Sequence, residues 1–252
     1  MQKNTTQISI IIATYNSEKY LKRCLNSILV QKGISIELIV VDNKSIDKTA
    51  ELVKNSHDLV DVFISEKDSG IYDAWNKGLK VATGDWIMFM GSDDVLLHDA
   101  LDFYLSLNLQ KENYDYIAPV INMVSERGKL VKKFGTDFKW VEFKEAMNLA
   151  HVGALHNRKL FKDVGNYNTE FKICGDYELL LRKGKTLKVQ FVDRIVAKMQ
   201  LGGISQTRAA LYESRRARYM HISPISYRSE VIFLALLAKH FLKGFFHVKS
   251  KT

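Results

Sequence analysis

Apolar and polar positions along the first 95 residues alternate between two patterns. Residues 8–13 form a continuous apolar run, typical of a strand buried on both faces of a parallel sheet. The next stretch repeats apolar residues every three or four positions, so we expect a helix that begins near Ser17, a residue type that caps helices. The alternation continues through strands at 36–41, 60–65 and 86–90 and helices at 47–55 and 72–82. This order predicts a parallel sheet with right-handed crossovers and a site at the carboxyl ends of its strands.

After residue 95 the pattern is less regular. Apolar spacing predicts a helix at 98–110, a hairpin of 116–124 and 130–134 around Gly128, helices at 143–149, 159–164 and 177–183, a strand at 189–196, and a helical tail from about Ala209. No internal repeat, low-complexity tract or Pro- or Gly-rich linker divides the chain. We therefore expect one α/β domain over residues 1–206, with a mostly parallel central sheet flanked by helices, and a helical tail over 207–252.

The composition is that of a soluble globular enzyme, because 46% of the 252 residues are apolar and 26% are charged. Cys24 falls on the apolar face of the first helix, so we expect a core residue and not a reactive thiol. Cys24 and Cys174 lack the spacing of a zinc site or a disulfide framework, which favours a reducing, cytoplasmic compartment. The polar start of the chain has no signal-peptide pattern, and no apolar run of 18 residues predicts a membrane span.

Basic charge is concentrated at the carboxyl end. Residues 207–252 contain nine Lys and Arg against Glu213 and Glu230, a net charge of +7, so the other 206 residues carry only +9 − 7 = +2. This distribution argues against a nucleic-acid partner, which would need a basic body. Within 231–248, aromatic and aliphatic residues such as Phe241 and Phe245 fall on one side of a helix. Lys and His recur every fourth residue on another side. Such a helix suits an anionic membrane surface, and the alternative is packing on the body or on a second copy in a homodimer.

Three polar clusters follow strands whose carboxyl ends should meet at one edge of the sheet. They are Thr14, Tyr15 and Asn16 after the first strand, Asp42 after the second, and Asp93 and Asp94 after the fourth. Adjacent carboxylates repel one another unless a cation or hydrogen-bond donor compensates. Carboxylate oxygens on a tight loop are ligands that Mg²⁺ and Mn²⁺ prefer, with positions left for phosphate oxygens. The alternative is that the aspartate pair caps the next helix.

Other phosphate-binding and hydrolase motifs are absent from the sequence. There is no Gly-x-x-x-x-Gly-Lys-Ser/Thr loop, no Gly-x-Gly-x-x-Gly after the first strand and no Gly-x-Ser-x-Gly elbow. These absences argue against P-loop hydrolysis, an ordinary dinucleotide fold and an α/β-hydrolase. A nucleotide would have to be held by carboxylates, hydroxyls and a metal ion.

The chain resembles family 2 glycosyltransferases with the GT-A fold, of the bacterial polysaccharide type, over roughly residues 7–206. The stretches that carry the resemblance occur in the family's order and spacing. They are Ile8–Asn16, Ile39–Thr49, Asp68–Gly78, Ala82–Asp85, Ser92–Asp94 and a later stretch from His151 through Gly165-Asn166-Tyr167 to Asp176–Arg182. The resemblance implies a Rossmann-like GT-A fold and a nucleotide-sugar donor, with UDP favoured.

The resemblance also implies roles for single residues. Thr14, Tyr15 and Asn16 would line the nucleoside pocket, and Asp42 would accept a hydrogen bond from uracil N3. Asp68 and Lys77 would face the ribose and the diphosphate. Asp94 would bind Mn²⁺ or Mg²⁺, and Asp93 would assist toward the ribose or the sugar. Asp176 matches the catalytic base, Gly203 and Ser205 lie in a stretch that resembles a lid, and His151 is either an acceptor contact or a structural histidine.

Two positions depart from the family pattern. The metal loop reads Gly-Ser-Asp-Asp, where a strict Asp-x-Asp is usual, and Gly175 precedes the base where many members have an acidic residue. The second departure leaves Glu178 as an alternative base. No Gln-x-x-Arg-Trp motif occurs, which argues against a processive polymer synthase.

The expected activity is an inverting transfer of a sugar to a hydroxyl of a glycan or a polyprenyl-linked sugar. We expect a cytoplasmic protein attached peripherally to the inner face of the membrane by its tail. Two other functions remain as alternatives: an inactive nucleotide-sugar-binding module, and a nucleotidyltransferase that makes nucleotide-sugars. The latter should have a Gly-rich loop with a basic residue near the start of the chain, and Thr14-Tyr15-Asn16 is not such a loop.

Overall fold

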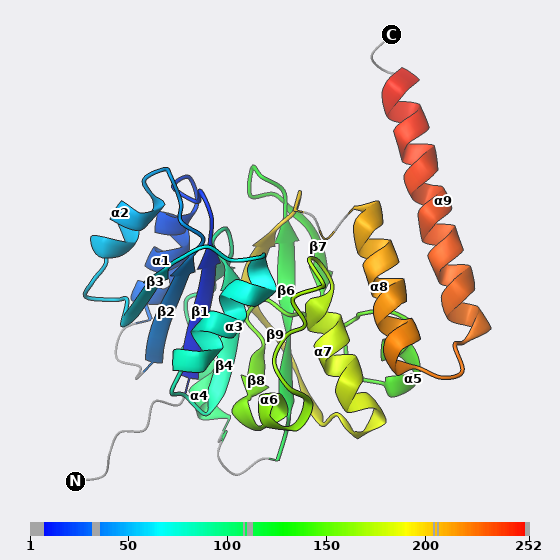
Figure 1. The fold of residues 1–252 in the computed structure, drawn as a ribbon, viewed down its shortest axis with the longest axis horizontal. Coiled ribbons are helices and arrows are strands. Elements are labelled where there is room, and N and C mark those ends of the chain that lie inside the picture. The colour runs from blue at the N-terminus through cyan, green and yellow to red at the C-terminus, as the bar shows by residue number, and fades with distance from the viewer. Residues whose placement is uncertain are drawn as a thin grey trace.

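The computed structural model describes residues 8–31, 36–107, 109, 113–203, 205 and 207–249, with side chains up to Lys239. The strands in these residues form one nine-stranded mixed sheet with the order β3-β2-β1-β4-β8-β6-β9-β5, and β7 pairs with β6 (Figure 1). Helices flank the sheet, so the α/β class expected from the sequence is confirmed.

The amino-terminal half of the sheet is parallel, as predicted. Its strands are β1 (Ile8–Thr14), β2 (Ile36–Asp42), β3 (Val62–Ser65) and β4 (Trp86–Gly91), and its helices are α1 (Leu21–Leu29), α2 (Thr49–Lys54) and α3 (Ile71–Val81). Ile10 and Ile12 pack in the same core cluster as Cys24 of α1, whereas Ile11 packs with Trp75 of α3. Apolar cores on both faces explain why β1 is apolar at every position except Ser9 and Thr14.

The predicted capping role of Ser17 is wrong. Helix α1 begins at Leu21, after Tyr20, and no side chain caps it. The hydroxyl of Ser17 instead lies 2.7 Å from the Ser92 hydroxyl, in the loop after β4. Ser17 therefore joins two loops at the carboxyl edge of the sheet.

The carboxyl-terminal half mixes strand directions. It contains β5 (Val95–Leu96), β6 (Tyr116–Val124), β7 (Leu130–Phe134), β8 (Leu155–Asn157) and β9 (Val189–Gln200). The predicted hairpin is confirmed, since β6 and β7 pair antiparallel. β5 and β8 have two and three residues, too few to show a period in the sequence. β8 connects the two halves, because it pairs antiparallel with β4 on one side and β6 on the other.

One predicted helix is wrong and another is shorter than expected. The segment expected to be helical at 143–149 holds only the end of α5 (Trp140–Phe143). Asn148 bonds through its carbonyl to the Thr136 N–H and through its side chain to the Thr136 hydroxyl, which holds the segment open. Helix α4 spans Ala100–Ser106, within the predicted 98–110, of which residues 108 and 110 lie outside the described part.

Four further helices complete the described chain. They are α6 (Arg158–Val164), α7 (Gly175–Lys183), α8 (Arg208–His221) and α9 (Tyr227–Lys249), with a short 3₁₀ turn η1 (Gly184–Thr186) after α7. Helix α8 packs against α7, and α9 lies beside α8 and extends beyond the body (Figure 1). Within the described chain, no helix combines the length and apolar character required to traverse a bilayer.

Candidate functional site

The carboxyl ends of β1 and β2 meet at a buried carboxylate. Asp42 is 0% exposed, and its two oxygens accept hydrogen bonds from the Thr14 hydroxyl at 3.1 Å, the Ser65 hydroxyl at 2.9 Å, the Ser45 N–H at 3.0 Å and the Ser45 hydroxyl. Thr14 is also buried, at 4% exposure. Asp42 and Thr14 thus lie buried beneath the loops that follow the first three strands, and Asp42 hydrogen-bonds to residues at or just after the end of each of these strands.

This arrangement bears on the base contact expected of Asp42. Four donors within the protein already hydrogen-bond to the carboxylate of Asp42. The nucleobase of the donor could therefore bond to it only by displacing one of them. Asn43, which the sequence analysis did not single out, is the more accessible neighbour. Its N–H donates to the Thr14 carbonyl at 3.0 Å, and its side-chain oxygen accepts from the Asp68 N–H at 2.8 Å. Asn43 therefore links the loops after β1, β2 and β3.

Tyr15 and Asn16 have different surroundings although they are adjacent. Asn16 has a φ of 46°, a left-handed conformation that asparagine tolerates better than most residues. Its N–H donates to the Ser45 hydroxyl at 2.9 Å, and its side-chain oxygen accepts from the Ile46 N–H at 3.0 Å. Tyr15 is 61% exposed beside this turn. Asn16 thus fixes the loop, and Tyr15 offers an open aromatic face.

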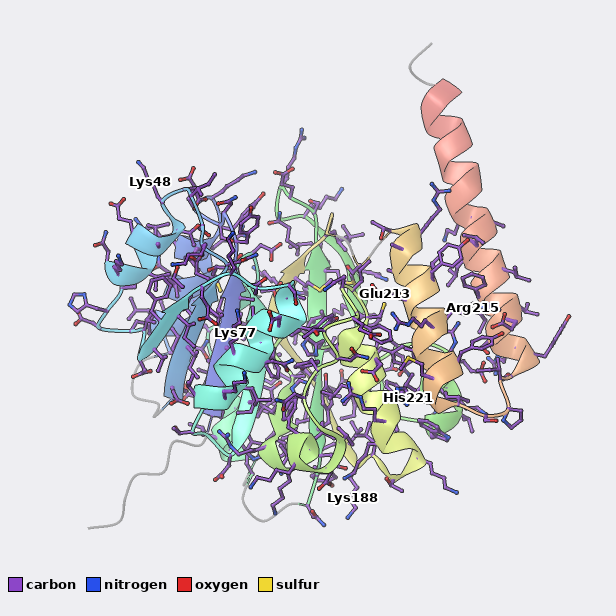
Figure 2. The ribbon with its side chains drawn as sticks, viewed as in Figure 1. Lys48, Lys77, Lys188, Glu213, Arg215 and His221 are labelled. Carbon is purple, nitrogen blue, oxygen red and sulfur yellow. The ribbon has the colours of Figure 1, made fainter. Side chains whose placement is uncertain are left out.

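Asp68 lies in the loop between β3 and α3, and Lys77 lies on α3. Asp68 accepts from the Gly70 N–H at 2.9 Å, and burial raises its pKa. Lys77 reaches back along α3 to the Lys67 carbonyl and lies 3.1 Å from Glu66 (Figure 2). Its ammonium group therefore already has partners in the loop before α3, and its expected role at the diphosphate stays a prediction.

The aspartate pair after β4 converges on one point. A Cβ at Gly91 would lie 2.9 Å from Oδ1 of Asp93 and 3.1 Å from Oδ2 of Asp94, so both carboxylates border the space that this glycine leaves. Asp94 is 3% exposed and accepts from the Gly91 N–H at 2.8 Å. Burial, and then the neighbouring Asp93 charge, raise the pKa of Asp94 well above its usual range. A cation between the two carboxylates would reverse that penalty.

The alternative role of the pair, as a helix cap, is wrong, because the next helix begins at Ala100 with Asp99 before it. The donor set of the pair is two hard carboxylates, which suits Mn²⁺ or Mg²⁺. Among the described residues, no group of three or more His, Cys, Asp and Glu side chains is placed to hold a metal ion. Two carboxylates could bind such an ion and would leave coordination positions for phosphate oxygens or water.

Asp176 lies in the first turn of α7, where Tyr72 of α3 approaches it. The Tyr72 hydroxyl donates to the Ile173 carbonyl at 2.7 Å and lies 3.3 Å from Oδ1 of Asp176. A Cβ at residue 175 would come within 2.8 Å of the Tyr72 ring, closer than side-chain atoms pack. The Tyr72 ring thus occupies the space that a side chain at residue 175 would need.

Helix α8 supplies the amino-terminal support of α7. Helix α7 begins after Cys174, whose side chain does not cap the helix. The carboxylate of Glu213, from α8, accepts the backbone N–H groups of Lys172, Ile173 and Cys174 at 2.8–3.1 Å (Figure 2). Glu213 was counted in the sequence only as a charge of the tail, since nothing local to it signals a partner 40 residues away.

Glu178, the alternative base, is unavailable. It is 1% exposed, and its carboxylate is paired with Arg182 on its own helix and with His221 at the end of α8, at 2.7 Å. These partners bind α8 to α7. Asp176, which is only half-buried, remains the candidate.

A cavity of about 600 Å³ adjoins Asp176. His151 lies on its wall, with its ring 4.9 Å from the Trp75 ring. Both ring nitrogens of His151 lack a hydrogen-bond partner among the described residues, and burial lowers the pKa of the ring. Ser205 also lines the cavity, whereas Gly203 is exposed nearby in sequence and Ile204 lies outside the described residues. His151 and Ser205 thus share a cavity with the candidate base.

Contacts connect these parts into one site. The loop after β2 bonds to Asp68, and Lys172 donates to the carbonyl of Ser69 at 2.6 Å. Tyr72, three residues further, touches Asp176. The loops that end β1–β4 and the start of α7 therefore form a continuous edge, with the paired carboxylates on one side and Asp176 on the other.

Comparisons with known proteins give the family of the chain. The profile of Glycosyl transferase family 2 matches residues 9–165. A PGL/p-HBAD biosynthesis glycosyltransferase of Mycobacterium bovis is 30% identical over 214 residues, which cover 79% of each chain. An uncharacterized glycosyltransferase of Haemophilus influenzae is 40% identical over 110 residues, 42% of this chain and 44% of that protein.

Solved structures share the fold at lower identity. S. aureus TarS 1-349 in complex with UDP-GlcNAc has a TM-score of 0.69 at 20% identity, over 94% of this chain and 73% of that chain. The mannosyltransferase PcManGT from Pyrobaculum calidifontis, in complex with GDP-Man and Mn²⁺, has a TM-score of 0.60 at 15% identity, over 92% and 69%. The fold is of the GT-A type, and the chain belongs to glycosyl transferase family 2.

Proposed function

We propose that this glycosyltransferase is an inverting enzyme that moves a sugar from a nucleotide-sugar, best a UDP-sugar, to an acceptor hydroxyl in the assembly of a surface polysaccharide or another glycan. The observation that carries the proposal is the edge on which the paired carboxylates Asp93 and Asp94 and the half-buried Asp176 are joined by contacts between neighbouring loops. The complexes of TarS with UDP-GlcNAc and of PcManGT with GDP-Man support a nucleotide-sugar donor.

The donor would lie against the loops after β1–β4. The exposed ring of Tyr15 offers a stacking surface for a base, on a turn that Asn16 and Asp42 hold in place. Asp94 and Asp93 would hold Mn²⁺ or Mg²⁺. When bound, such an ion supplies a Lewis acid that neutralises charge on the departing diphosphate. Asp68 stands at the same edge, next to Asn43.

The transfer itself is a single displacement. As the acceptor oxygen bonds to the anomeric carbon, the bond from that carbon to the diphosphate oxygen breaks, and Asp176 takes the proton from the acceptor hydroxyl. Attack from the face opposite the leaving group inverts the configuration. Tyr72 and the backbone that Glu213 supports hold the carboxylate of Asp176 in its place.

The tail would bring the enzyme to its acceptor, a glycan or a polyprenyl-linked sugar at the inner face of the membrane. Val231 and Leu234 of α9 are 45% and 60% exposed, and basic residues lie on both α8 and α9. Apolar side chains of this kind insert between lipids, and Lys and Arg are attracted to anionic headgroups. The sequence also points to Phe241 and Phe245 for membrane binding, but these two residues lie outside the described side chains. The alternative occupant of this face is a second copy, in a homodimer.

Two variants test the proposed reaction. Asp176→Asn should keep UDP affinity and lower turnover by roughly 10²–10⁴, the usual effect of a positioned base. Asp94→Ala should abolish transfer and remove the dependence of UDP binding on Mn²⁺. The measurements are isothermal titration with UDP, with and without Mn²⁺, and release of UDP from a panel of UDP-sugars. Turnover within threefold of wild type in Asp176→Asn would contradict the base, and a wild-type protein that binds UDP without turning over any donor would favour the inactive binding module.

A further inference from the structure

The cavity beside Asp176 is too large to be a packing defect. Protein interiors contain few voids larger than a water molecule, whereas pockets for small ligands occupy about 300–1,000 Å³. The volume here is about 600 Å³, and the candidate base is part of the wall. We therefore take the cavity to be the place where the acceptor lies, an assignment that rests on the function proposed above.

The wall chemistry does not suit a purely polar acceptor. Most of the described lining residues are apolar, among them Met123, Met147, Leu149, Met199 and Leu201. A free oligosaccharide would leave many hydroxyl groups against these side chains without hydrogen-bond partners, at a cost for each. Three of the lining residues are methionines, whose flexible side chains can adapt to a flexible apolar chain.

The tail helices close one side of the cavity. Ser214 of α8 and Leu236 and Lys239 of α9 line it together with the strands of the body. Lys239, and Lys132 from β7, are exposed residues among the lining, so positive charge is available where the cavity meets solvent. An occupant with an apolar body inside and a polar or anionic part outside would satisfy both regions.

We propose that this cavity binds the apolar part of an amphiphilic acceptor, an alkyl chain or a ring system that lies close to the hydroxyl receiving the sugar. The tail is then part of the acceptor site and does more than attach the enzyme to a surface. Asp176 faces the cavity from the first turn of α7, so a hydroxyl carried on such an apolar body would meet the base at the cavity wall.

Alkyl glucosides of increasing chain length provide the probe. We would titrate the full-length protein with n-butyl, n-hexyl and n-octyl β-D-glucopyranoside, each below its critical micelle concentration, and measure UDP affinity in the same preparations. Each methylene that moves from water into the cavity should strengthen binding by about fourfold. We expect the octyl compound to bind at least about tenfold more tightly than the butyl compound.

Two leucines of α9 test whether the alkyl chain binds inside the cavity, because only one of them lines it. Leu236 is 41% exposed and lines the cavity, whereas Leu234 is 60% exposed on the same helix and does not line it. Leu236→Glu should reduce the ratio of octyl to butyl glucoside affinity to below about threefold. Leu234→Glu should leave this affinity ratio unchanged. Leu236→Trp, which fills the cavity without adding charge, should also reduce the ratio and serves if the glutamate variant fails to fold.

The outcomes separate this inference from the function on which it rests. A wild-type protein that binds UDP but shows no dependence on chain length overturns the amphiphilic acceptor alone. Equal losses in Leu234→Glu and Leu236→Glu also overturn it, because the chain would then bind the outer surface of α9. Failure of UDP to bind contradicts the proposed donor, while the chain-length ratio and its loss in the Leu236 variants still decide whether the cavity takes an apolar chain.

Discussion

Glu213 provides a sharp test of how the tail supports the active site. Its carboxylate is the acceptor for three successive backbone N–H groups, those of residues 172–174, immediately before α7. Replacing it with alanine leaves these donors without a protein partner and removes a negative charge from the start of a helix. Replacing it with glutamine removes the charge and exchanges one of the two acceptor oxygens for an NH₂ group, so one acceptor oxygen remains. Asp176 follows two residues after the last of these N–H groups, so its position depends on theirs.

The expected magnitude follows from known capping energies. Loss of a helix cap costs about 0.5–2 kcal/mol, and a carboxylate near a helix amino terminus contributes up to about 2 kcal/mol in partly buried geometry. We expect Glu213→Ala to lower the free energy of unfolding by about 2 kcal/mol, and Glu213→Gln by about 1 kcal/mol. A displacement of the base by about 1 Å can lower turnover by about 10². We therefore expect kcat to fall by about 10- to 100-fold in the alanine variant, with partial recovery in the glutamine variant.

Urea unfolding and steady-state UDP release measure these effects separately. The matched control is Glu230→Gln, because Glu230 is the other glutamate of the tail and its carboxylate pairs with Arg215 of α8 (labelled in Figure 2) instead of with backbone N–H groups before α7. It should leave kcat and the KM for the donor unchanged. The reasoning is refuted if Glu213→Ala is destabilised yet turns over at the wild-type rate, or if the control loses as much turnover as the test variant. A changed donor KM with unchanged kcat would place the effect at the donor loops.

Three further predictions concern packing, protonation and the tail. Gly175→Ala should lower the free energy of unfolding by about 1–3 kcal/mol through collision with the Tyr72 ring, and Tyr72→Leu in the same chain should restore part of the loss in thermal unfolding. Burial lowers the pKa of His156 well below its usual 6.5, so the unfolded chain binds a proton that the folded one does not; stability should fall as pH drops below about 6.5, with a shallower slope in His156→Leu. Truncation after Tyr227 should leave a protein that binds UDP but no longer sediments with anionic liposomes, whereas full-length protein should sediment less as salt rises; unchanged sedimentation of the truncated form would refute the membrane role.

The sequence by itself determined the amino-terminal half of the fold. The apolar run of β1 and the helical spacing after it are local patterns, and they predict a buried parallel strand and an amphipathic helix wherever they occur. Cys24 was correctly expected in the core for the same reason, and it is 0% exposed. The polar residues after β1, β2 and β4 could be predicted to meet because parallel strands end at a common edge.

Only the tertiary structure decided what those polar residues do. Asp42 and Lys77 are expected to contact the donor, which stays a prediction. The partners that each side chain already has within the protein, Ser65 for Asp42 and the Lys67 carbonyl for Lys77, could not be predicted from local sequence. Asn16 and Ser17 likewise serve as loop ties through partners about 30 and 75 residues distant. Hydrogen bonds of this kind have no period and no local signature.

The tail shows the same division. Its basic charge and amphipathic spacing could be read from the sequence, and so could its helical state. That Glu213 would support the start of α7, and that Leu236 would line the cavity beside Asp176, follows only from the packing of α8 and α9 on the body. Local sequence fixes which face of a helix is apolar, but the surface that this face meets is set by the whole fold, because it depends on the shape and free donors of elements formed elsewhere in the chain.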